Sequence, residues 1–156
     1  MGRELKLVAV FIVAYAVGLV SFVLATVVLI VVKPGGGSLS LGIILLALSP
    51  IWLSAYIVAL PFNLACVGML LLARKVVPRT SERISIGLCV VLGIFAGLVT
   101  TLVFSSIFYY SVIGEAPSLA QLFTYKEGLA LLFSFLGASS VAFCIGWWSV
   151  SSGDAA

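Results

Sequence analysis

Histidine and charged side chains are the scarcest groups in this sequence. It has no histidine, and Asp, Glu, Lys and Arg make up 8% of its 156 residues, where about 25% is usual for a soluble domain. A soluble fold needs more polar surface than this to cover its core, so the soluble class is excluded. The net charge of +3 is small, which argues against a nucleic-acid partner.

These absences also remove most catalytic chemistry. Without histidine the chain lacks the commonest general base, bis-histidine haem ligation and most membrane zinc sites. No Asp, Glu, Lys or Arg lies within the long apolar segments, which argues against a proton relay and against an intramembrane hydrolase or transferase. The G-x-S-x-G, H-E-x-x-H and P-loop patterns are missing too. The sequence therefore favours a protein that is not an enzyme and predicts no cofactor.

Cysteine is sparse and unpaired. Cys66, Cys89 and Cys144 are far apart in the sequence and form no C-x-x-C motif, so a disulfide scaffold is not indicated. They fall at similar depth in three different apolar segments, where three thiolates could together bind a soft metal such as Cu(I). Cysteine also behaves as a small hydrophobe. This second interpretation is favoured, and the sequence predicts no metal site.

What the sequence has in abundance is long apolar segments. Hydrophobic residues make up 63% of the chain, against about 45–50% in soluble domains. Four uncharged segments each exceed the roughly 20 residues that a helix needs to cross a bilayer, and they span residues 7–32, 50–73, 84–113 and 128–150. The prediction is an all-α integral membrane protein: one membrane domain over residues 1–156, folded as a bundle of four transmembrane helices.

The second apolar stretch is longer than one span requires. Residues 39–73 would form a helix about 52 Å long, against a hydrocarbon core of about 30 Å. Ser49 followed by Pro50 is typical of a helix start, so we expect a span over 50–73 and a short interfacial helix over 39–48. The alternative is one strongly tilted helix that is kinked at Pro50 and Pro61.

A second interfacial segment is expected over residues 117–126. It places Leu119, Leu122 and Phe123 at helical spacing, which fits a short helix lying in the membrane interface. An ordinary loop with a few apolar residues is equally compatible with the pattern.

The basic residues predict the orientation. The loop over residues 74–83 is basic, and six Lys and Arg fall on its side of the membrane against two on the other. The positive-inside rule then places both termini in the cytoplasm, and a bacterial inner membrane suits this compact design. The loop's side chains are expected to touch anionic lipid headgroups, with a protein docking site as the less favoured interpretation; they are Arg74, Lys75, Arg79 and Arg83.

Polar and small residues inside the spans are the remaining candidates. A polar set falls near the middle of the spans, as interhelical hydrogen-bonding groups or, less favoured, as the lining of a small polar site; it comprises Asn63, Thr100, Thr101, Ser139 and Ser140. Small residues at four-residue spacing let helix backbones approach closely; those predicted to pack are Gly18, Ser21, Gly93, Gly97 and Gly137.

These features favour a non-catalytic membrane subunit that binds and positions partners in a larger membrane assembly. Its expected partners are the lipid bilayer and other membrane subunits or a second copy of itself. The alternative is a small transporter or channel, in which a homo-oligomer lines a path with the polar set near the middle of the spans.

Overall fold

The computed structural model describes residues 2–32, 50–76 and 82–153, and within these ranges all the regular structure is helical. The segment predicted as an interfacial helix over 39–48 lies outside the described residues. Ser49, which directly precedes the expected helix start at Pro50, lies outside them too. Five helices follow one another along the described chain: α1 (Arg3–Val32), α3 (Pro50–Val76), α4 (Glu82–Ile113), α5 (Leu119–Thr124) and α6 (Lys126–Gly153).

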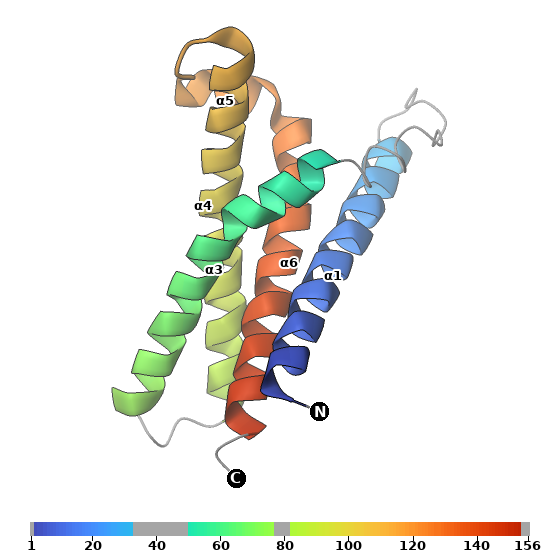
Figure 1. Ribbon diagram of the computed structural model, residues 1–156. Coiled ribbons are helices and arrows are strands. Elements are labelled where there is room, and N and C mark those ends of the chain that lie inside the picture. Colours follow the sequence, from blue (N-terminus) through green and yellow to red (C-terminus); the bar gives the residue numbers. More distant parts are fainter. Residues whose placement is uncertain (1, 33–49, 77–81, 154–156) are drawn as a thin grey trace.

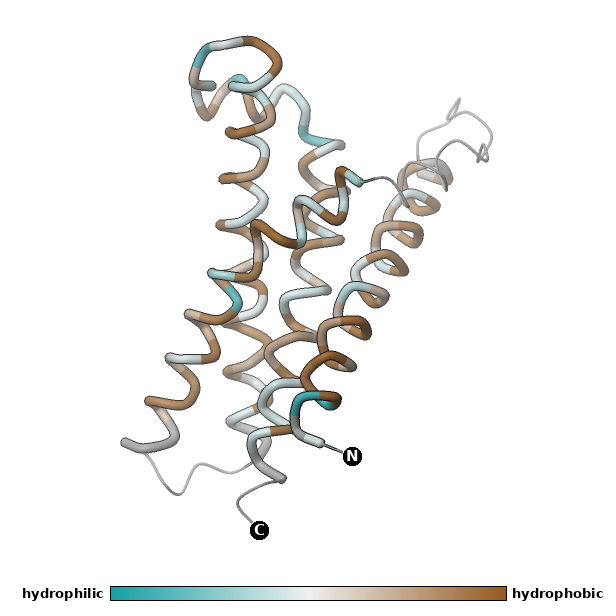
Figure 2. Tube along the Cα trace, in the orientation of Figure 1, coloured by the Kyte–Doolittle hydropathy of each residue, from teal (hydrophilic) through white to brown (hydrophobic). Residues whose placement is uncertain are grey.

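Four of these helices are long and apolar enough to cross a membrane, over Glu4–Leu29, Pro50–Ala73, Ser85–Ile113 and Lys126–Ser151. Figure 2 shows apolar residues along the whole length of each, with a hydrophilic stretch midway along α3. The all-α class and the four long apolar helices predicted from the sequence are confirmed. The fold is that of a helical membrane protein.

Helix α6 holds the bundle together. It packs extensively against α1 and α4 and makes a smaller contact with α3, which itself packs on α4 (Figure 1). The two termini lie at the same end of the bundle, and α5 lies at the opposite end. α1 is attached to the remaining helices mainly through α6, so most of its surface faces away from the protein.

Helix α3 begins at Pro50 and runs without interruption through Pro61. Proline lacks the N–H that would bond to the preceding turn and pushes that turn aside, and α3 changes direction along its length in Figure 1. The expected span over 50–73 lies within α3, and the segment over which the two expectations differ, residues 39–49, lies outside the described residues.

The short helix α5 falls within the segment 117–126. Ser118 caps it: the Ser118 hydroxyl accepts from the Gln121 backbone N–H at 3.3 Å, and the Ser118 N–H donates to Gln121 Oε1 at 2.7 Å. This reciprocal pair satisfies two N–H groups that the helix itself leaves free. Leu122 is buried, whereas Leu119 and Phe123 are exposed.

The core has two parts. An aromatic cluster joins α1, α3 and α6, with ring centroids 4.3 Å apart for Phe22 and Trp52 and 5.1 Å apart for Trp52 and Phe135. The Tyr56 hydroxyl donates to the carbonyl of Phe11 at 3.2 Å and so links α3 to α1. The second cluster joins α3, α4 and α6 and contains the three cysteines.

Candidate functional site

The polar set near the middle of the spans lies entirely inside the bundle. Its members are at most 3% exposed, although they come from three helices; they are Asn63, Thr100, Thr101, Ser139 and Ser140. Packing of α3, α4 and α6 thus gathers every one of these candidates away from lipid. None of them lines the outer surface of the single chain.

Three of these side chains bond within their own helices. The hydroxyl of Thr100 donates to Ala96 O at 2.6 Å, that of Thr101 to Gly97 O at 2.7 Å, and that of Ser139 to Leu136 O at 3.1 Å. Serine and threonine can satisfy themselves in this way on carbonyls three or four residues earlier. These three hydroxyls thus donate within their own helices, and the expected hydrogen bonding between helices stays a prediction for them.

Asn63 and Ser140 are different, because both are fully buried and neither has a hydrogen-bond partner among the described residues. The unpartnered atoms are Asn63 Nδ2, Asn63 Oδ1 and Ser140 Oγ. Buried polar atoms normally find partners, and each exception calls for an explanation. Asn63 and Ser140 are the groups of this set with hydrogen-bonding capacity left over.

The two residues also lie at similar depth. The Cys66 thiol donates to Leu92 O across α3 and α4 at 3.6 Å, and Gly93 faces Val141 across α4 and α6. Both helix pairs are antiparallel in Figure 1. Asn63, three residues before Cys66, is therefore level with residue 95 of α4. Residue 95 is in turn level with residue 139 of α6. Asn63 and Ser140 thus differ in depth by about one residue, a rise of about 1.5 Å.

The three cysteines share one buried cluster. Cys66, Cys89 and Cys144 are free thiols, all buried, and they pack together with Leu70 and Ala96. Within the described part of the chain, no three His, Cys, Asp or Glu side chains are placed to hold a metal ion. The thiols pack as small hydrophobes.

The four glycines predicted to pack lie at close approaches between helices. A Cβ added at Gly97 would lie 2.5 Å from Gly137 Cα, and one at Gly93 would lie 2.6 Å from Val141 Cα, so α4 and α6 meet backbone to backbone. A Cβ at Gly18 of α1 would lie 2.9 Å from the ring and the carbonyl oxygen of Phe135 on α6. Ser21 is half-buried one turn further along α1.

The basic loop lies largely outside the described residues. Arg79 lies outside the described residues, as do the side chains of Arg74, Lys75 and Arg83. Their contact with lipid headgroups stays a prediction.

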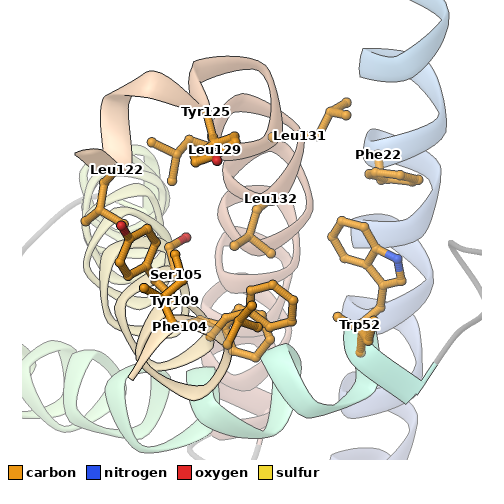
Figure 3. A pocket seen from close by; sticks show the side chains of 15 residues that line it. Phe22, Trp52, Phe104, Ser105, Tyr109, Leu122, Tyr125, Leu129, Leu131 and Leu132 are labelled. Carbon is orange, nitrogen blue, oxygen red and sulfur yellow. The ribbon is translucent and has the colours of Figure 1, made fainter. Parts of the chain in front are cut away.

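The structure contains a pocket that the sequence did not indicate. Its volume is about 450 Å³, and it lies between the α5 ends of α4 and α6 (Figure 3). Few of the side chains that line it carry a polar atom; the lining comprises Phe22, Ile51, Trp52, Phe104, Ser105, Phe108, Tyr109, Val112, Ile113, Leu122, Tyr125, Gly128, Leu129, Leu131 and Leu132. Five parts of the chain contribute to the pocket, so no local sequence motif indicates it.

The fold defines the class of this chain as a helical membrane protein. No protein-family model, no curated protein and no solved structure matches it.

Proposed function

We propose that the chain is a non-catalytic integral membrane subunit that binds and positions a transmembrane helix of a partner subunit. The observation that carries this proposal is the outer face of α1. Only 17% of the α1 span is buried within the chain, against 33–39% for the other three spans. The helix therefore offers more free surface for a partner than any of the others.

The composition of that face differs from that of the outer face of α3. Nine of the eleven large apolar side chains exposed on α1 are β-branched, whereas on α3 only Ile51 and Ile57 are, out of seven. We call the nine the α1 ridge; they are Val8, Ile12, Val13, Val17, Val20, Val23, Val27, Val28 and Val31.

β-Branched side chains suit a helix–helix contact. In a helix Val and Ile are already held in essentially one χ1 rotamer, so packing them against a neighbour costs little side-chain entropy. Helix association in a bilayer depends on van der Waals packing rather than on a hydrophobic effect. The α1 ridge thus supports a partner helix better than a leucine-rich face would.

We expect Val20→Trp to reduce recovery of the partner by about tenfold. Val20 is 60% exposed at the middle of the ridge, so an indole there would hold a second helix away without disturbing the fold. The measurement is pull-down from native membranes in mild detergent, with captured proteins quantified by mass spectrometry.

The matched control is Leu64→Trp, which adds the same side chain to the outer face of α3, where Leu64 is 48% exposed. It should capture as much partner as the unchanged chain. The proposal fails if the unchanged chain is recovered alone and monodisperse, or if both variants capture equally. Recovery of a second copy of this chain alone would replace the partner subunit with a homo-oligomer.

The transporter or channel alternative is less well supported by the geometry. The polar set is buried within one bundle, so copies of this bundle could line a shared path with it only by opening the contacts among α3, α4 and α6. Flux of ions or small neutral solutes into liposomes, abolished by Asn63→Leu, would favour this alternative.

We further propose that the end of the bundle carrying both termini faces the cytoplasm of a bacterial cell. α3 ends and α4 begins at that same end, and the positive-inside rule assigns the basic sequence between them to the cytoplasm. Helix α5 would then lie in the opposite interface, with exposed Leu119 and Phe123 reaching into the apolar boundary.

This orientation predicts which side of the inner membrane a water-soluble maleimide can label. In a chain whose three cysteines are replaced by Ala, Ser118→Cys should react in intact spheroplasts, and Gly2→Cys should react only after lysis. Labelling of Gly2→Cys in intact spheroplasts would reverse the proposed orientation.

A further inference from the structure

The pocket beside α5 has a structural origin in the seam between α4 and α6. The two helices touch at Gly97 and Gly137, where neither residue has a side chain. Toward α5 the seam carries Phe104 on one helix and Leu132 on the other. These side chains cannot approach as closely as the glycines do, so the seam widens into a pocket of about 450 Å³, a size typical of small-molecule sites.

The lining of this pocket suits hydrocarbon rather than water. Its polar atoms are the hydroxyls of Ser105, Tyr109 and Tyr125 and the indole nitrogen of Trp52. In Figure 3 that nitrogen lies on the side of α1, and the carbon ring of Trp52 faces the other lining residues. Water needs two to four polar partners to occupy a cavity, and apolar cavities stay dry. An apolar occupant therefore fits the lining best.

The pocket is open at the end of the spans. Its outer lining includes Val112, Ile113 and Tyr125, which are 69%, 51% and 67% exposed. The spans that contain or adjoin these residues end at Ile113 and begin at Lys126. The mouth consequently lies at the depth where the bilayer core gives way to headgroups, and the apolar molecules at this depth are lipid chains.

Charges at this end of the spans favour one kind of lipid. Lys126 and Glu127 directly follow the lining residue Tyr125, and Glu115 lies two residues beyond Ile113; all three side chains are exposed. This mixture of one basic and two acidic groups is complementary to the phosphate and the ammonium group of a zwitterionic headgroup. We propose that the pocket binds one acyl chain of a zwitterionic phospholipid, with its headgroup beside Lys126 and Glu115.

Photo-crosslinking tests this proposal on the whole chain. The protein is reconstituted in nanodiscs that contain a trace of phosphatidylethanolamine with a diazirine on one acyl chain. After illumination, labelled peptides are quantified by mass spectrometry. We expect the peptides of residues 104–113 and 128–132 to be labelled at least about fivefold more than the α1 ridge, which meets only bulk lipid in this preparation.

A pair of glycine variants makes the test specific to the pocket. A Cβ added at either Gly128 or Gly68 would meet no heavy atom within 4 Å, but only Gly128 lines the pocket. Gly128→Phe should reduce labelling of the pocket peptides to the level of the α1 ridge, and Gly68→Phe should leave it unchanged. Equal labelling of pocket and ridge in the unchanged chain, or equal labelling in both variants, would overturn the proposal.

Competition distinguishes the phospholipid from a free fatty acid. Excess unlabelled phosphatidylethanolamine should displace the probe from the pocket, and excess palmitate should not. Displacement by palmitate to the same extent would overturn the assignment to a phospholipid. The only residue of α1 that lines the site is Phe22, which is buried and is not part of the α1 ridge, so this outcome is independent of whether Val20→Trp loses a partner.

Discussion

Gly97→Ala is expected to lower the free energy of unfolding by about 3 kcal/mol, at the upper end of the usual cost of overpacking. The new Cβ would lie 2.5 Å from Gly137 Cα and 2.7 Å from Gly137 N. Both of these atoms belong to backbone, so no side chain can rotate out of the way. α4 and α6 must therefore move apart along the seam on which the bundle depends. Unfolding of the reconstituted protein in increasing dodecyl sulfate would measure the loss.

The same change at Gly87 provides the control. Gly87 also lies in α4, and a Cβ there would meet nothing within 4 Å. Gly87→Ala should be neutral or raise stability by up to about 1 kcal/mol, because alanine favours the helix over glycine. Gly18→Ala should fall between the two, because its closest contacts, with the ring and the carbonyl oxygen of Phe135, are longer at 2.9 Å. Equal stability of the Gly97 and Gly87 variants would contradict the close approach of α4 and α6.

How much of this fold the sequence predicts depends on the range of the interaction. The four long apolar helices follow from apolar length alone. The four glycines predicted as packing positions do lie at close approaches, but the pattern could not say what each would meet. Gly97 meets Gly137 on the neighbouring helix, whereas Gly18 meets the large side chain of Phe135. That choice depends on the register between helices, which no single segment encodes.

The same distinction, between what one segment encodes and what depends on contacts between helices, applies to the candidate site. Depth along a span can be counted from the sequence, and this count alone places Asn63 and Ser140 at a similar level. The hydrogen-bond partner of a side chain could not be predicted in this way, because the Thr100 hydroxyl donates to a carbonyl of its own helix. The pocket could not be predicted from the sequence for a related reason. Its lining residues range from Phe22 to Leu132, and the space exists only where α4 and α6 diverge.

Asn63→Leu is expected to raise the free energy of unfolding by about 1–3 kcal/mol. The Asn63 amide is fully buried with both polar atoms unpartnered, whereas in the unfolded state it meets water or detergent headgroups. Folding thus removes its hydrogen bonds without replacing them. Leucine has the same number of side-chain heavy atoms and no polar group to desolvate. The same dodecyl sulfate titration would measure the gain.

Thr100→Val is the matched control, since it also exchanges a buried polar group for an apolar one of similar shape. The Thr100 hydroxyl already donates to Ala96 O, so its removal should change stability by no more than about 0.6 kcal/mol. Asn63→Ala guards against overpacking by leucine, because it removes the amide without adding volume. If both Asn63 variants were less stable than the unchanged chain by more than the loss of packing explains, the amide would have a partner in the membrane-embedded protein. Asn63 and Ser140 would then mark a polar binding site at this depth, and the transporter alternative would gain over the subunit.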